Sequence, residues 1–109
     1  MASRVKVVTS ICSHETWITA EMDGEDRIKV SIETDCSSVK DYGERLTSVS
    51  MDDISELRDS RIMTEAHDGI LTPTCLVPVA VFNVCWMESG MISKRLATKE
   101  GSIAIHFID

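Results

Sequence analysis

Four cysteines are the residues of this sequence best suited to metal binding or redox chemistry. Three of them fall at the ends of predicted secondary-structure elements. Cys12 follows a β-branched segment, Cys36 joins an alternating segment to a helical one, and Cys75 comes just before an apolar segment. A helix N-terminus lowers the pKa of a nearby thiol, because its unpaired N–H groups carry partial positive charge. Cys36 and Cys75 are both expected at such a position. The three thiols are therefore candidates for one shared thiolate site.

A cysteine is also a small hydrophobic residue that is often buried for packing alone. Cys85, between Val84 and Trp86, fits this interpretation and is assigned to the core. The other three are widely separated, at positions 12, 36 and 75, and match no short zinc motif of the Cys-x-x-Cys type. For these three, packing and function both stay open as explanations.

Converging thiolates would select soft ions, because sulfur ligands favour zinc, copper(I) and iron-sulfur clusters over magnesium or calcium. Two further residues are candidates for a fourth ligand. His14 lies two residues after Cys12 and would complete a closed zinc site of three cysteines and one histidine. Asp35 would supply an oxygen ligand or, alternatively, cap the helix that follows it. A fourth position left open would instead permit exchange of the ion or cluster.

Composition and charge limit the class of protein. The 109 residues are 43% hydrophobic and 27% charged, which is ordinary for one globular domain, and we treat residues 1–109 as a single domain. The formal net charge is -7 at pH 7. Nucleic acids and anionic membranes are bound mainly through lysine and arginine, so this charge argues against both as partners. An unidentified protein partner is compatible with it.

The hydrophobic runs are too short for export or membrane insertion. Residues 1–11 lack the apolar stretch of a signal peptide, and the longest apolar run, residues 75–87, is interrupted by Pro78 and Asn83. That run would not cross roughly 30 Å of hydrocarbon. We therefore expect a cytoplasmic protein in a reducing compartment, where free or metal-bound thiols are more common than disulfides.

Hydrophobic periodicity predicts an α+β fold. Residues 5–11, 16–22 and 27–34 have the β-branched or alternating character of strands, and Asp23-Gly24 supplies a tight hairpin turn between the last two. Helices are predicted at 39–49, at 50–58 behind a capping box of Ser50 and Asp53, and at 76–90. Residues 59–74 are predicted to be mostly loop, with a helical turn or two at 62–67. A closing strand is predicted at 102–108, so the sheet would contain three N-terminal strands and a C-terminal one, with helices on one face.

This order of elements resembles the IscU/NifU iron-sulfur scaffold family. One cysteine follows the first strand, a second follows the third strand, and the last opens a late helix. In that family, three cysteines at these positions hold a nascent cluster or zinc. The local sequence is more similar to a small prokaryotic family with no assigned activity. Its members have an early cysteine, an acidic residue before a second cysteine, and Cys-x-x-Pro followed by Glu-x-Gly. Here these are Cys12, Asp35-Cys36, Cys75 with Pro78, and Glu88-Ser89-Gly90. The resemblance implies that the three cysteines belong together.

The leading hypothesis is a metal or iron-sulfur binding protein with Cys12, Cys36 and Cys75 as ligands, acting as a scaffold, a carrier or a structural zinc protein. One alternative is an interaction module or homodimer without metal, burying Trp17 or a methionine surface at Met87 and Met91. Another is a thiol redox protein with one low-pKa cysteine and a resolving partner.

Motifs for catalysis are missing from the sequence. No glycine-rich phosphate loop, Ser/His/Asp set or zinc-protease motif is present. His67 and Asp68 are adjacent in sequence and precede Gly69, so they are typical of a turn and not of a base with its orienting carboxylate. His106 alternates with apolar residues and is expected on the exposed face of a strand. We therefore do not assign an enzymatic activity.

Overall fold

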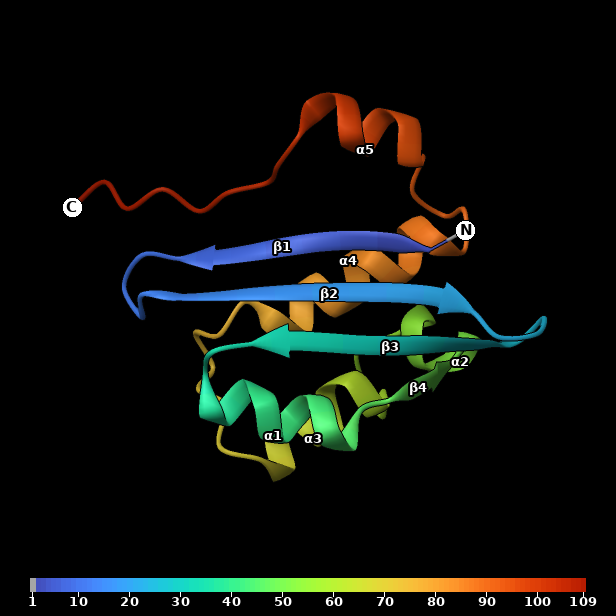
Figure 1. Ribbon diagram of the computed structural model, residues 1–109, viewed down its shortest axis with the longest axis horizontal. Coiled ribbons are helices and arrows are strands. Elements are labelled where there is room, and N and C mark those ends of the chain that lie inside the picture. The colour runs from blue at the N-terminus through green and yellow to red at the C-terminus, as the bar shows by residue number, and fades with distance from the viewer. Residues whose placement is uncertain (1) are drawn as a thin grey trace.

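Three long strands build most of the sheet: β1 (Ser3–Thr9), β2 (His14–Met22) and β3 (Arg27–Thr34). They belong to a computed structural model that describes residues 2–109 (Figure 1). A short strand, β4 (Ser48–Ser50), pairs with β3, which gives the antiparallel order β1-β2-β3-β4. The hairpin predicted at Asp23-Gly24 is present, and Gly24 has a φ of 86°, the left-handed conformation that such a turn requires.

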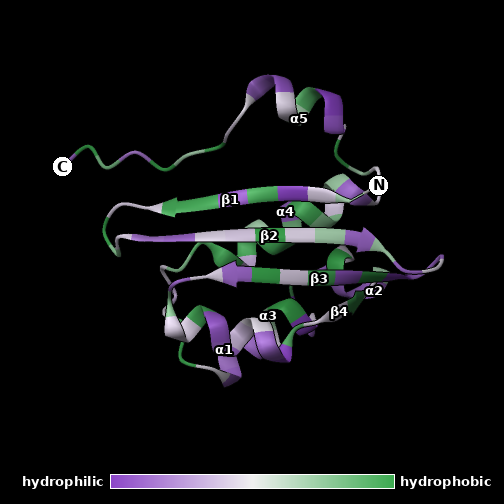
Figure 2. Cartoon of the chain, viewed as in Figure 1, coloured by the Kyte–Doolittle hydropathy of each residue, from purple (hydrophilic) through white to green (hydrophobic). Residues whose placement is uncertain are grey.

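Alternation along the strands separates a buried face from a solvent face. Ile18 and Ala20 of β2 and Ile28 of β3 are completely buried. Trp17 and Thr19 lie on the opposite face of β2, as the two-residue period of a strand requires. Figure 2 shows the same alternation as changes of colour along β2 and β3.

Five helices follow the N-terminal strands: α1 (Ser37–Arg45), α2 (Met51–Ser55), α3 (Arg61–Asp68), α4 (Val77–Glu88) and α5 (Lys94–Glu100). Helix α4 packs against β1 and β2, and α1 packs against β3 (Figure 1). Pro78 lies in the first turn of α4, where its missing N–H costs no helical hydrogen bond. The predicted α+β class is therefore confirmed. Within residues 2–109, no helix has the length and apolar character needed to cross a bilayer.

The predicted closing strand at residues 102–108 is wrong. This segment is exposed and pairs with no other strand in residues 2–109, and the fourth strand of the sheet is β4 instead. Alternating Ile103, Ile105 and Phe107 satisfy the local preference for an extended chain. A strand also needs a neighbour for its backbone hydrogen bonds, and sequence periodicity does not identify one.

The helix boundaries also differ from the prediction. The first helix ends at Arg45, not at position 49, because the chain then turns to lie beside β3, where Val49 faces Ile28. The β-branched character of the residues after Leu46 favours this strand. Helix α3 is longer than the one or two turns expected, and its N-cap, Ser60, accepts a hydrogen bond from the N–H of Ile62. Helix α5 was not predicted.

Candidate functional site

The candidate ligands come from three chain segments that meet at one end of the sheet. These are the turn between β1 and β2, the junction between β3 and α1, and the segment leading into α4. Figure 1 shows that turn, the arrowhead of β3 and the start of α4 at the same end of the molecule. The antiparallel register produces this arrangement, because it pairs Thr9 with His14 and Thr16 with Thr34. The end of one strand thus lies beside the beginning of the next.

Cys75 is a candidate thiol whose pKa is raised above its usual value. Burial raises the pKa of Cys75, a hydrogen bond from the backbone N–H of Val77 acts in the opposite direction, and the charges of Cys36 and Cys12 raise it further. The segments that carry the three cysteines, distant in sequence, meet at the same end of the sheet (Figure 1). Cys12 is exposed, while Cys36 and Cys75 are half-buried.

Cys36 is the N-cap residue of α1, the type of position that the sequence predicted for it. Its backbone N–H donates to the Oγ1 of Thr34 at 3.1 Å, and its carbonyl accepts from the N–H of Lys40 at 2.9 Å. No side chain caps this helix. The Cys36 thiol therefore lies beside the positive end of the α1 backbone dipole, with the backbone itself held in place.

His14 and Asp35 form a pair. The Nδ1 atom of His14 lies 3.0 Å from the Oδ1 atom of Asp35, which also accepts a hydrogen bond from the N–H of Glu15 at 3.3 Å. The predicted role of Asp35 as a helix cap is therefore wrong, since its carboxylate is directed to β2. Because a carboxylate only accepts hydrogen bonds, Nδ1 is the donor, and Nε2 is the ring nitrogen left to accept or to bind a ligand.

The side chains do not form a finished metal site. Within residues 2–109, no three histidine, cysteine, aspartate or glutamate side chains are grouped closely enough to hold a metal ion in their present positions. Cys12 lies in the exposed turn at residues 10–13, where Ser13 adopts a positive φ of 58°. Any common binding by the three thiols therefore requires their side chains, and this turn, to move together.

Comparison with known proteins identifies the family. Residues 3–100 match the family described as Family of unknown function (DUF6951). The chain belongs to the DUF6951 family. No curated protein and no solved structure matches it. The prediction of a family without an assigned activity is therefore confirmed, whereas neither the resemblance to the IscU/NifU scaffolds nor the three-cysteine motif gains support.

The remaining cysteine and the other histidines of this DUF6951 protein lie on other elements than the candidate ligands. Cys85 is completely buried in α4, and burial raises its pKa to about 12, with the charge of Glu88 adding to the effect. It is a core residue, as predicted. His67 is exposed near the end of α3, and His106 is exposed in residues 102–108.

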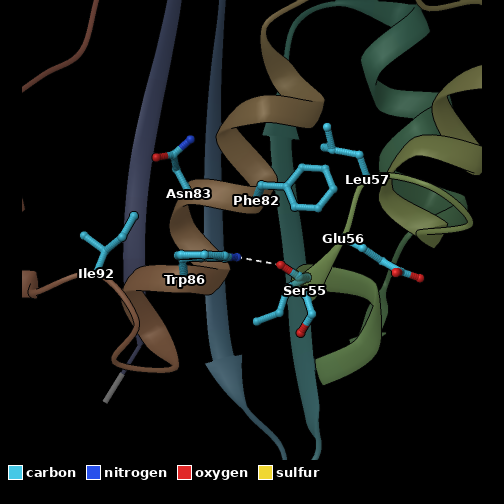
Figure 3. A pocket seen from close by; sticks show the side chains of 8 residues that line it. Ser55, Glu56, Leu57, Phe82, Asn83, Trp86 and Ile92 are labelled. Atoms are coloured by element: carbon cyan, nitrogen blue, oxygen red, sulfur yellow. Dashed lines mark hydrogen bonds between the residues drawn. The ribbon is translucent and has the colours of Figure 1, made fainter.

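The DUF6951 protein also has an apolar groove, between α4 and the segment that follows α2 (Figure 3). Phe82, Trp86 and Leu57 line it, and the Nε1 atom of Trp86 donates to the carbonyl of Ile54 at 2.6 Å. Of the described residues that line it, Glu56 alone is titratable. The hydroxyl of Ser55, which also lines the groove, donates to the carbonyl of Met51 at 2.7 Å. Among residues 2–109 the groove therefore offers packing surface and no acid–base pair.

The methionine surface considered as an interface is only partly present. Met87 is buried in the core, while Met91 is exposed. Trp17 lies on the open face of the sheet with Arg4 and Lys6 over its ring, at 4.3 and 5.0 Å from the ring centre. These cations cover much of the indole and interact favourably with its face. Met91 is therefore the exposed methionine of the pair, and Trp17 is partly buried beneath the two cations.

Sequence reasoning missed the contact between His14 and Asp35. Both residues were named, but as competing ligands for one position. The predicted hairpin could have indicated this contact, because two strands joined by a tight turn at Asp23-Gly24 must pair in a fixed register. That register places the start of the second strand beside the end of the third.

Proposed function

We propose that this DUF6951 protein binds one zinc ion through Cys12, Cys36 and Cys75, with His14 as the fourth ligand. The observation that supports this proposal most directly is that the three segments carrying these cysteines meet at one end of the sheet (Figure 1). Binding of one ion by all three thiols would require their side chains and the turn at residues 10–13 to move together. Their sulfur atoms are soft ligands that suit zinc.

The electrostatic effect of Cys12 and Cys36 on Cys75 gives the ion a reason to bind. Without a metal, burial and the neighbouring thiols keep Cys75 protonated. A divalent cation would replace these protons and convert repulsion among thiolates into attraction to a common positive charge. Binding would therefore release protons, and zinc affinity would rise with pH.

His14 has the arrangement that a zinc ligand commonly adopts. Histidines that bind zinc usually donate their second ring N–H to a carboxylate, which fixes the ring orientation and makes the binding nitrogen more basic. Asp35 is such a carboxylate for Nδ1 of His14. We therefore assign Nε2 of His14 as the ligand atom and Asp35 as a positioning residue that does not touch the ion.

Movement of the exposed turn at residues 10–13 would complete the site. Cys36 and Cys75 are anchored beside α1 and α4, whereas Cys12 lies on a surface turn. Rotation of this turn toward the other two thiols would then assemble all three. A site closed by four protein ligands is typical of structural zinc, not of catalytic zinc, which keeps a position open for water.

The test is metal analysis of protein purified without oxygen. We expect about one zinc per chain, by the ligand count of a single tetrahedral site. Replacement of Cys12, Cys36 or Cys75 by serine should abolish stoichiometric zinc. Cys85→Ala is the matched control, because it removes a thiol from the core and should leave the zinc in place.

Other outcomes would contradict the zinc assignment. Iron with bound sulfide and a visible absorption spectrum would show an iron-sulfur cluster on the same thiols. A metal-free protein that takes up no added zinc and forms a reversible disulfide would be a thiol redox protein. Zinc retained in all three serine variants would exclude the thiols as ligands.

A further inference from the structure

Residues 102–108, called the tail below, carry large apolar side chains that are left in water. Ile103, Ile105 and Phe107 are 80%, 65% and 77% exposed. Scattered exposed apolar residues are normal on a protein surface, but alternate apolar residues in one extended run form a patch with the pattern of a half-buried strand. The tail therefore has the sequence of a strand that lacks a partner.

The sheet has a free edge of matching length at β1. Within residues 2–109, β1 pairs only with β2, so its outer side presents backbone N–H and C=O groups to solvent. Both β1 and the tail span seven residues. Figure 1 shows α5 and the tail on the β1 side of the sheet, and Lys94 of α5 donates to the carbonyl of Ala2 at 3.2 Å.

Charge also favours contact between these two segments. The whole chain has a net charge of -7, so two copies carry like net charge and repel each other overall. Neither β1 nor the tail contains an aspartate or a glutamate. β1 carries Arg4 and Lys6, and the tail ends next to Asp109. Contact between them places no two carboxylates opposite each other.

We propose that the tail of one copy adds as a strand to the β1 edge of a second copy, and that the second copy's tail does the same in return. Within one chain the tail stays extended and unpaired after Gly101, which has a positive φ of 89°. A reciprocal exchange satisfies both edges at once and closes with two-fold symmetry. Backbone hydrogen bonds supply affinity, and Ile103, Ile105 and Phe107 are withdrawn from water together.

The test compares the mass of the full chain in solution with hydrogen exchange of its backbone amides. A chelator is present throughout, so that a shared metal ion cannot join two copies. We expect a dimer at high concentration, with slow exchange at both β1 and the tail. On dilution to monomer, both segments should lose protection together.

Two tail variants should weaken the dimer. Ala104→Pro removes a backbone donor from the added strand, and Ile105→Glu places a charge on its apolar face. Each should raise the dissociation constant by roughly tenfold or more. Leu57→Glu is the matched control, because Leu57 is also exposed, at 68%, but lies away from both segments. It should leave the dissociation constant unchanged, and circular dichroism should show all three variants folded.

Several results would overturn the exchange. A monomer whose tail amides exchange freely at every concentration would exclude pairing altogether, and a monomer with a protected tail would mean that the tail pairs within its own chain. A dimer insensitive to Ala104→Pro would use another surface. Growth to polymers would indicate an open-ended addition. The exchange does not rest on the zinc proposal, since neither segment contributes a thiol.

Discussion

At the scale of single residues, the hydrogen bond between His14 and Asp35 is the most informative contact of the candidate site. If His14 binds zinc, then Asp35→Ala removes the acceptor that orients the ring, and zinc affinity should fall by about 10-fold to 100-fold. Asp35→Asn keeps a side-chain oxygen as acceptor and should lose less. Competition for zinc against a coloured chelator measures both changes.

Asp68→Ala is the control for this prediction, because Asp68 is an exposed aspartate at the end of α3 and is not among the proposed ligands. Its affinity for zinc should equal that of the unmodified protein. Equal affinity for Asp35→Ala as well would show that the carboxylate does not position a ligand. A complete loss of zinc would instead mean that Asp35 binds the ion itself.

The sequence predicted the positions of individual cysteines relative to elements better than it predicted contacts between residues. Cys36 at a helix N-cap, Cys75 before a helix and Cys85 in the core follow from local patterns. Contacts depend on strand register and on the packing of distant segments. The role of Asp35 was wrong for this reason, because its partner His14 lies on a different strand.

At the scale of elements, β2, β3 and α4 were predicted well because each has a strong period or a clear start signal. Alternation defines the two strands, and Pro78 marks the first turn of α4. The short strand β4 was missed because three residues are too few for a period. It exists because the chain returns beside β3, which is a tertiary effect that overrides local preference.

The capping box at Ser50 and Asp53 was predicted from spacing, and it is present. The Asp53 carboxylate accepts from the N–H of Ser50 at 2.9 Å and from the N–H of Arg61 at 3.0 Å, so it joins the starts of α2 and α3. Burial acts to raise the pKa of Asp53, but these backbone hydrogen bonds outweigh it and hold the pKa below its usual 3.8. The ionised carboxylate thus stabilises the fold.

We expect Asp53→Ala to lower the free energy of unfolding by about 1 to 2 kcal/mol at neutral pH, because it removes a cap and leaves two N–H groups unpaired. A group with a lowered pKa stabilises the folded state above its ordinary pKa and loses that effect as pH falls through the lowered value. The difference between Asp53→Ala and the unmodified protein should therefore shrink as pH falls below 3.8. Urea unfolding at several pH values measures it, and a difference that is constant with pH would contradict this role.

At the scale of the whole molecule, the proposed ion would join three segments that only the folded chain brings together. An unfolded chain spreads positions 12, 36 and 75 apart, so zinc should bind the native state far more tightly. A ligand at 100 times its dissociation constant then stabilises the native state by about 2.7 kcal/mol. For a domain of this size, that corresponds to an increase of on the order of 10 °C in melting temperature.

The pH dependence of this increase separates thiolate binding from adventitious binding at surface carboxylates. Protons compete with zinc for the thiols, and the raised pKa of Cys75 makes that competition strong at neutral pH, so the increase in melting temperature should grow as pH rises. Cys75→Ser should show almost no increase at any pH, while Cys85→Ala should melt lower without zinc yet keep the full increase. Scanning calorimetry at fixed free zinc measures all three proteins. An equal increase in the melting temperature of Cys75→Ser would mean that zinc binds at a site without Cys75. Loss of one ligand from a shared site must weaken zinc binding, and with it the stabilisation that the ion gives to all three segments.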